Sequence, residues 1–335
     1  MYREASQAPE IVRRQLESNA AGVRALGETL RARAPRAVVT CARGSSDHAA
    51  TFARYLIDTH LGILTSSASP SLSSVYETDT DLSDTVFIAI SQSGKSPDLL
   101  AAAERAKSSG AFVIALCNTA DSPLARLAHR SVDLLAGPET SVAATKSYIA
   151  SLSAIAHLIA EWTQHRDLLD ALHAAPALLD RAWSLDWTPA IRHLRNATNL
   201  FVVGRGYGLG VAQEAALKFK ETSGLHAEAF SSAEVQHGPM ALVRSGFPVL
   251  MLSQSDETRS GIETLAGDFL ERGATVLLAG GNAKDAVQLP VIDAHPVIEP
   301  MLMILSFYRM VSALAVERGF DPDIPPHLRK VTETV

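Results

Sequence analysis

The amino-acid sequence repeats itself, and this repetition limits the folds that the chain can adopt. Residues 37–44 (AVVTCARG) are similar to residues 199–206 (NLFVVGRG), and residues 86–93 (VFIAISQS) are similar to residues 249–255 (VLMLSQS). In both pairs the matching residues stand 162 positions apart. Equal offsets at separate places indicate a duplicated domain, so we expect two units with the same fold.

Each copy alternates short apolar runs with longer helical patterns. The apolar runs show no polar alternation, which is typical of strands buried on both faces of a parallel sheet. This order predicts an α/β fold with two tandem doubly wound parallel sheets. We expect a helical segment at 1–36, a first domain at 37–165, a helical linker at 166–196, a second domain at 197–320 and a tail at 321–335.

Composition excludes several classes of protein. A hydrophobic content of 47% excludes a disordered chain, and a net charge of −6 argues against nucleic acid as a partner. The two cysteines, Cys41 and Cys117, are too few for a disulfide framework and indicate a reducing compartment. The apolar runs at 147–160 and 301–316 are expected to be core helices, because the first is short and the second contains Arg309. With no signal-peptide pattern at the N-terminus, we expect a cytoplasmic globular protein without a membrane partner.

Two polar loops of the first copy follow apolar runs, where ligands bind in doubly wound folds. In the first loop, Ser45 and Ser46 follow Gly44 and precede a helical pattern at 49–57. The second loop offers hydroxyl and amide groups around a glycine, namely Ser91, Gln92, Ser93 and Ser96. Free amides and hydroxyls at a helix start bind anions, so the second loop predicts a phosphate cradle. An ordinary serine N-cap stays an alternative for both loops.

The second loop does not match a nucleoside triphosphate site. Ala89 stands where the P-loop pattern requires glycine, so a phosphate monoester is the expected ligand. A third polar loop, at 137–146, ends in Lys146 at the start of an apolar helix. A cation there opposes the helix dipole, which indicates a negative ligand or a carboxylate partner nearby, or has no functional meaning.

The second copy contains a group of titratable residues. Glu214, Lys218 and Glu221 are spaced by four and three and share one helix face, while Lys220 points elsewhere. A surface ladder of salt bridges is the ordinary explanation. With His237 sixteen residues further on, the same group suits proton transfer at a sugar carbonyl. Metal-ligand spacings and a nucleophile elbow are missing from the sequence, so we expect no metal or organic cofactor.

Taken together, these motifs resemble the sugar isomerase (SIS) domain family, and most closely the isomerase half of glutamine–fructose-6-phosphate aminotransferases. The resemblance rests on the strings SQSG (91–94), VAATK (142–146), EAALKFKE (214–221), HAEAF (226–230), EVQHGP (234–239) and DIPPHLRK (323–330). It implies two flavodoxin-like domains, in agreement with the duplication.

The resemblance also implies roles for particular residues. Lys218, Glu221 and His237 match the catalytic lysine, the proton-shuttling glutamate and the ring-opening histidine, and Lys330 matches a tail lysine that closes over the sugar. The residues matching contacts to the sugar or its phosphate are Ser45, Ser46, Ser91, Gln92, Ser93, Ser96, Val142, Ala143 and Ala144. Ala144 departs from the family, which has a serine there. In the second copy, Asp256 replaces Gly94, so we expect only the first copy's loop to bind phosphate.

The resemblance implies a function as well. The chain lacks the N-terminal cysteine of a glutaminase, so we expect a SIS-type glucosamine-6-phosphate deaminase that forms fructose 6-phosphate and ammonia. A homodimer is implied, because in the family each active site takes its histidine from a neighbouring subunit. The alternatives are a deglycase or aminotransferase-type isomerase acting on another amino-linked sugar 6-phosphate, a phosphosugar-binding regulator and a non-catalytic partner subunit.

Overall fold

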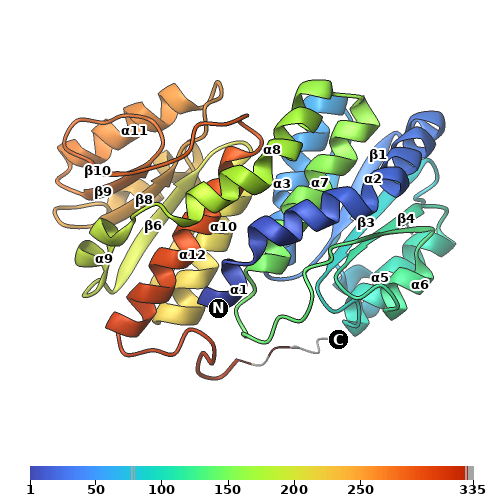
Figure 1. Ribbon diagram of the computed structural model, residues 1–335, viewed down its shortest axis with the longest axis horizontal. Coiled ribbons are helices and arrows are strands. Elements are labelled where there is room, and N and C mark those ends of the chain that lie inside the picture. The colour runs from blue at the N-terminus through green and yellow to red at the C-terminus, as the bar shows by residue number, and fades with distance from the viewer. Residues whose placement is uncertain (77, 79, 329, 331–335) are drawn as a thin grey trace. The chain divides into compact units, whose positions relative to one another are not determined.

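The structure is a computed structural model that describes residues 1–76, 78, 80–328 and 330. The chain forms two compact units, each built on one parallel sheet (Figure 1). The first unit consists of Glu10–Glu139 and Lys146–His173, and it includes the described Lys330. The second unit consists of Met1–Pro9, Thr140–Thr145 and Ala174–Leu328.

The sheet of the first unit has five parallel strands in the order β2-β1-β3-β4-β5. These strands are β1 (Ala37–Cys41), β2 (Leu64–Ser67), β3 (Thr85–Ser91), β4 (Phe112–Cys117) and β5 (Arg130–Asp133). The helices between and around them are α2 (Ala8–Arg33), α3 (Ser45–Leu61), α4 (Ser71–Ser74), α5 (Pro97–Ser108), α6 (Pro123–Leu127) and α7 (Lys146–Thr163). Every residue of β3 and β4 is buried, as the continuous apolar runs predict.

The sheet of the second unit also has five parallel strands, in the order β10-β9-β8-β6-β7. They are β6 (Asn199–Gly204), β7 (His226–Ser231), β8 (Pro248–Leu252), β9 (Thr275–Ala279) and β10 (Val287–Leu289). The helical elements are α1 (Tyr2–Ala5), α9 (Thr188–Leu194), α10 (Gly208–Ser223), α11 (Arg259–Glu271), α12 (Glu299–Glu317) and the short turns η1 (Glu234–Gln236) and η2 (Pro239–Leu242). The predicted linker contains α8 (Arg166–Trp183), whose residues belong partly to each unit.

The two sheets pair their strands in the same register. Ala37 pairs with Leu64 across β1 and β2, and Asn199 pairs with His226 across β6 and β7. Both residues of the second pair stand 162 positions after those of the first. The structure therefore confirms the predicted α/β fold of two doubly wound parallel sheets, and the duplication extends to individual backbone partners.

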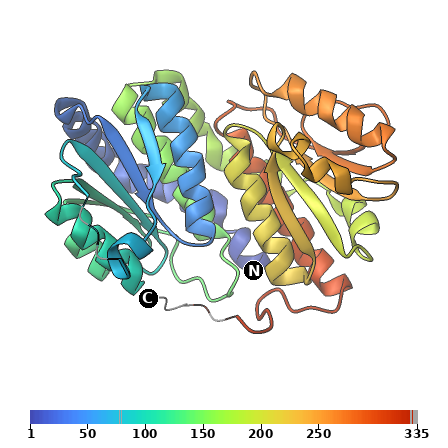
Figure 2. The same ribbon diagram turned by 180° about the vertical axis from the view of Figure 1, so that it is seen from behind.

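Two apolar helices form part of the core, as the sequence predicts. α7 is buried over almost its whole length in the first unit. α12 packs against α10 in the second unit and is, in the described part of the chain, the one helix long and apolar enough to cross a membrane. Since 83% of that apolar stretch is buried inside the structure, α12 serves as a core helix. Figure 2 shows α10 and α12 side by side from the side opposite to Figure 1.

Candidate active site

The loop after β1 turns directly into a helix. Gly44 has φ +55° and is the N-cap of α3, so the helix begins at Ser45 rather than at residue 49. Ser45 and Ser46 are half-buried in the first turn, where backbone amides lack helical partners. A serine N-cap, the ordinary alternative for this loop, is wrong here because the cap residue is glycine.

The loop after β3 forms a compact turn around Gly94. The Ser91 hydroxyl accepts the Gly94 amide at 3.0 Å, and the Ser93 hydroxyl accepts the Lys95 amide at 3.3 Å. Gly94 has φ +63°, and a side chain there would collide with Ser122. Ser96 is the N-cap of α5, but within the described residues its hydroxyl accepts no hydrogen bond from the helix. The half-buried Ser96 hydroxyl is thus not used as a cap.

An ion pair between an exposed arginine and a buried aspartate ties these two loops together within the first unit. Arg43, in the first loop, has Nε and Nη2 each 2.9 Å from Oδ2 of Asp98, on the first turn of α5. The Asp98 side chain is only 1% exposed, and β1 and β3 are neighbours in the sheet. The two loops therefore lie at the same carboxyl edge, where doubly wound folds bind ligands. Burial raises the pKa of the nearby Asp47 carboxyl, while His48 and Arg43 oppose the rise.

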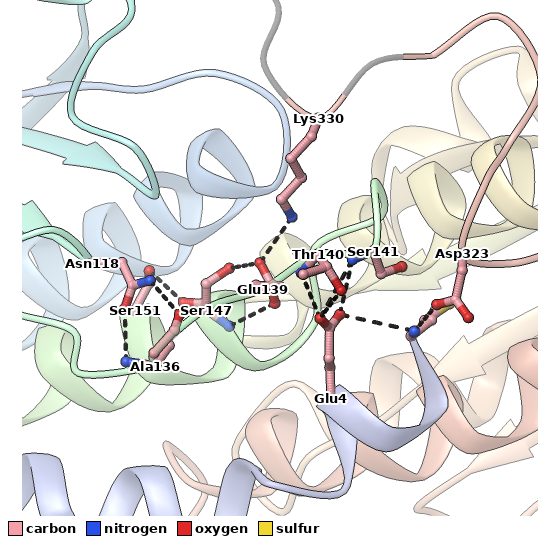
Figure 3. A network of polar contacts seen from close by, with 12 residues as sticks. Glu4, Asn118, Ala136, Glu139, Thr140, Ser141, Ser147, Ser151, Asp323 and Lys330 are labelled. Atoms are coloured by element: carbon pink, nitrogen blue, oxygen red, sulfur yellow. Dashed lines mark hydrogen bonds and ion pairs between the residues drawn. The ribbon is translucent and has the colours of Figure 1, made fainter.

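Glu139 is a buried carboxylate at the start of α7 (Figure 3). It accepts the Ser147 amide at 3.2 Å and the Ser147 hydroxyl at 2.6 Å. The ammonium of Lys330 lies 3.3 Å from the same carboxylate. Such a carboxylate is stabilised by the helix dipole, and it lies at the helix end where a carboxylate near Lys146 was one of the explanations that the sequence left open. The structure thus places the predicted tail lysine on Glu139 of the first unit, whereas residues 329 and 331–335 of the predicted tail lie outside the described residues.

The segment containing Val142, Ala143 and Ala144 belongs to the second unit. The Val142 amide donates to the Asp323 carbonyl at 3.2 Å, while Ala143 is buried and Ala144 is half-buried. Just before it, the Thr140 amide donates to Glu4 of α1 at 2.5 Å (Figure 3). Backbone contacts therefore fix this segment from both α1 and the residues after α12.

The predicted titratable face of α10 is buried. Nζ of Lys218 lies 3.2 Å from Oε1 of Glu214 and 2.6 Å from Oε2 of Glu221. The side chains of Lys218 and Glu214 are 0% exposed and that of Glu221 is 19% exposed. The ordinary explanation, a surface ladder, is therefore wrong. Lys220, in contrast, is exposed, as predicted.

A tyrosine that no sequence pattern singled out supports this group. The hydroxyl of Tyr308, on α12, donates to Oε1 of Glu214 at 3.0 Å, and Tyr308 is fully buried. Burial acts to lower the pKa of Lys218, but the carboxylates of Glu214 and Glu221 outweigh it, so the pKa is raised. Lys218 therefore stays protonated at neutral pH, and Glu221 is the member of the group that reaches solvent.

His237 lies on an exposed turn. It follows η1, and its amide donates to the Glu234 carbonyl at 2.9 Å. Within the described residues, its imidazole has no hydrogen bond to Lys218 or Glu221. An exposed histidine is available to a ligand or to another subunit. In the described part of the chain, no cluster of three or more histidine, cysteine or acidic side chains is placed to hold a metal ion.

The two cysteines of the chain have free thiols, and both are buried. Cys41 ends β1 and Cys117 ends β4. Burial raises the pKa of Cys41 to about 12 and that of Cys117 to about 11. Both thiols are therefore protonated and unreactive at neutral pH.

Comparison with known proteins shows where this arrangement belongs. Glutamine–fructose-6-phosphate aminotransferase [isomerizing] of Methanothermobacter thermautotrophicus is 34% identical over 304 residues, which are 86% of this chain and 50% of that protein. The enzyme of the same name from Thermococcus kodakarensis is 31% identical over 350 residues, which cover 98% of this chain and 57% of that enzyme. The chain thus spans about half the length of the curated relatives that it matches.

Solved structures show the same fold. A crystal structure of a proposed phosphosugar isomerase from Silicibacter pomeroyi DSS-3 has a TM-score of 0.93 and 42% identity, covering 96% of this chain and 99% of that one. The C-terminal domain of glucosamine-fructose-6-phosphate aminotransferase from Francisella tularensis has a TM-score of 0.88 and 25% identity. The match covers 97% of this chain and 98% of that domain. The SIS domain family matches residues 33–160 and 193–298, one match on each sheet. This chain therefore belongs to the SIS domain family.

Proposed function

We propose that this chain is a phosphosugar isomerase that acts on an amino sugar 6-phosphate, and specifically a glucosamine-6-phosphate deaminase. The observation that carries the proposal is the buried group of Lys218, Glu214 and Glu221, with Glu221 as its solvent-reaching member. A desolvated ammonium held by two carboxylates is costly to build and is typical of a site that moves protons. The names of the curated relatives, which include fructose 6-phosphate and isomerisation, agree with it.

The loop at 91–96 is proposed to bind the phosphate. It supplies backbone amides at the start of α5 and the hydroxyls of Ser91, Ser93 and Ser96. Such neutral donors hold a phosphate monoester without a metal ion. Ser45 and Ser46, in the first turn of α3 at the same sheet edge, are proposed to contact the sugar.

Glu221 is proposed to carry the proton that defines the reaction. After His237 has moved a proton to open the pyranose ring, Glu221 takes the proton from C2 and delivers it to C1. Lys218 stabilises the negative charge that develops on the C1 oxygen in between. The C1 oxygen gains a proton to become a hydroxyl while the amino group loses one, so that the aldose becomes a ketose imine at C2. Water then adds to C2 and the nitrogen leaves as ammonia, which gives fructose 6-phosphate.

Two further assignments belong to the same proposal. Lys330 would leave Glu139 to bind the open-chain sugar, and Val142, Ala143 and Ala144 would contact it through the backbone. The protein would work in the cytoplasm as a homodimer in which His237 serves the partner's site. The residue roles and the homodimer follow from the family resemblance, and the cytoplasmic location follows from the two cysteines, which are too few for a disulfide framework.

A product assay tests the proposed function. Purified protein is incubated with glucosamine 6-phosphate, and ammonia and fructose 6-phosphate are measured separately. Formation of both in equal amounts, abolished in Glu221→Gln, is expected. Turnover only with another amino-linked sugar 6-phosphate would indicate the deglycase or aminotransferase-type alternative. Binding of sugar phosphates without any turnover would indicate a regulator and would overturn the proposal.

A further inference from the structure

The second unit contains a loop that matches the proposed phosphate loop of the first. Residues 253–258 follow β8, the central strand of their sheet, and residues 91–96 begin at the last residue of β3, the central strand of the first sheet. The offset of 162 positions that relates the two sheets places Ser255 at the position of Ser93. The chain therefore contains the same strand–loop–helix framework twice.

A carboxylate of the chain itself fills the second loop. The Ser255 amide donates to Oε2 of Glu299 at 2.6 Å, and the Ser255 hydroxyl donates to Oε1 at 2.7 Å. The Ala294 amide donates to Oε1 at 3.1 Å, and Nη2 of Arg259 lies 3.8 Å from Oε2. The Glu299 side chain is only 4% exposed. Two amides, a hydroxyl and a guanidinium thus surround one buried anion.

Asp256 is not the anion on this loop, although its place in the sequence led us to expect that it excludes phosphate. Its carboxylate accepts the Thr258 amide at 2.9 Å and the Gln254 side-chain amide at 2.8 Å. It therefore stabilises the turn before α11. Glu299, which is 44 residues further along the chain from Ser255, is the group that occupies the donors.

We infer that residues 253–258 form a second oxyanion site whose ligand is the Glu299 carboxylate. The donor set is the one that binds phosphates and carboxylates, because charge-assisted hydrogen bonds from amides and a guanidinium favour oxyanions. Glu299 saturates this site, so the loop at 91–96 keeps the proposed phosphate-binding role. In the first loop, within the described residues, the Ser93 amide has no acceptor of its own.

Chemical rescue tests this inference. Glu299→Ala replaces the outer CH₂COO⁻ group by hydrogen, and acetate (CH₃COO⁻) is this group with one added hydrogen, so acetate fits the vacancy. The melting temperature of the variant is expected to fall by about 4–10 °C in chloride. In 0.1 M acetate or phosphate at least half of this loss is expected to be regained, while the wild-type protein shifts little. If the variant does not fold in chloride, its refolding yield in acetate is compared with that in chloride instead, and an increase is expected.

Two matched variants make the result specific. Glu299→Ala combined with Ser255→Ala should lose the rescue. Ser255 then keeps its amide but no longer has the hydroxyl that donates to the bound anion. In equilibrium dialysis with inorganic phosphate, Glu299→Ala should bind one more phosphate per chain than the wild-type protein. This difference is independent of whether the loop at 91–96 binds phosphate. The inference would be overturned if Glu299→Ala had the same melting temperature in acetate as in chloride. It would also be overturned if the variant bound the same number of phosphates per chain as the wild-type protein.

Discussion

Removal of the Glu214 carboxylate should lower the free energy of unfolding, because Glu214 belongs to the buried ion-pair group of α10. Truncating one partner of a buried ion pair costs about 3–5 kcal/mol, because the remaining charge is left without compensation. In this chain Nζ of Lys218 keeps a second carboxylate, Glu221, at 2.6 Å. The Tyr308 hydroxyl, which donates to Glu214 at 3.0 Å, also loses its acceptor. We therefore expect Glu214→Ala to lower the free energy of unfolding by about 3 kcal/mol, the lower end of that range.

The loss should depend on pH in a defined direction. The pKa of Lys218 is raised above its ordinary value of 10.5, so the stability that its charge contributes is fully present below about pH 10.5. It is lost as the pH rises through the folded-state pKa, where the ion pair disappears from the wild-type protein. The gap between wild type and Glu214→Ala should therefore be constant from about pH 6 to 9 and narrow at higher pH.

Urea unfolding followed by circular dichroism between about pH 6 and 11.5 measures this gap. Lys220→Met is the matched control, because Lys220 is exposed on the same helix and should change stability by less than about 0.5 kcal/mol. Glu214→Gln should cost less than Glu214→Ala, since its side-chain oxygen still accepts from Tyr308. A loss below about 0.5 kcal/mol in Glu214→Ala, typical of an exposed pair, would refute the reasoning. A gap that does not change with pH would refute it as well.

Three further predictions concern activity. Ser93→Ala should raise KM about tenfold with little change in kcat, because phosphate contacts form equally in the ground and transition states. Steady-state kinetics of this variant, compared with a Ser108→Ala control, measure the effect. Mixing inactive Glu221→Gln with inactive His237→Ala should restore some activity through hybrid dimers; no recovery after confirmed subunit exchange would mean that each site lies within one chain. Deletion of residues 330–335 should lower kcat at least tenfold, about 1.4 kcal/mol of barrier, and unchanged kinetics would remove Lys330 from the mechanism. The melting temperature is measured alongside, because the deletion also takes the Lys330 ammonium away from the buried Glu139 carboxylate.

Features that depend on local periodicity could be predicted from the sequence. Strand runs such as residues 86–90 are apolar throughout, so a buried parallel sheet follows from them directly. The spacing of Glu214, Lys218 and Glu221 likewise fixes a common helix face, because residues three and four apart are neighbours on any α-helix. The repeated offset predicts the duplication, which the strand registers reproduce.

Features that depend on distant partners could not be predicted. Burial of the α10 group requires α12, which brings Tyr308 to Glu214 from 94 residues away. The filling of the second loop by Glu299 depends on where the first residue of α12 lies relative to Ser255, and no local pattern encodes that. The start of α3 differs from the expected one for another reason, because Gly44 caps the helix by its backbone geometry and not by a side chain.

The central claim is that Glu221 moves a proton between C2 and C1 of a sugar phosphate. Incubating the purified chain with fructose 6-phosphate and ammonium, or with glucosamine 6-phosphate, in D₂O tests it most directly. Proton NMR then measures deuterium entering C1 or C2, independently of how far the net reaction proceeds. The account predicts enzyme-dependent exchange that Glu221→Gln abolishes while sugar phosphate binding is retained. Exchange that continues in Glu221→Gln, or no exchange in the wild-type protein with either substrate, would contradict it.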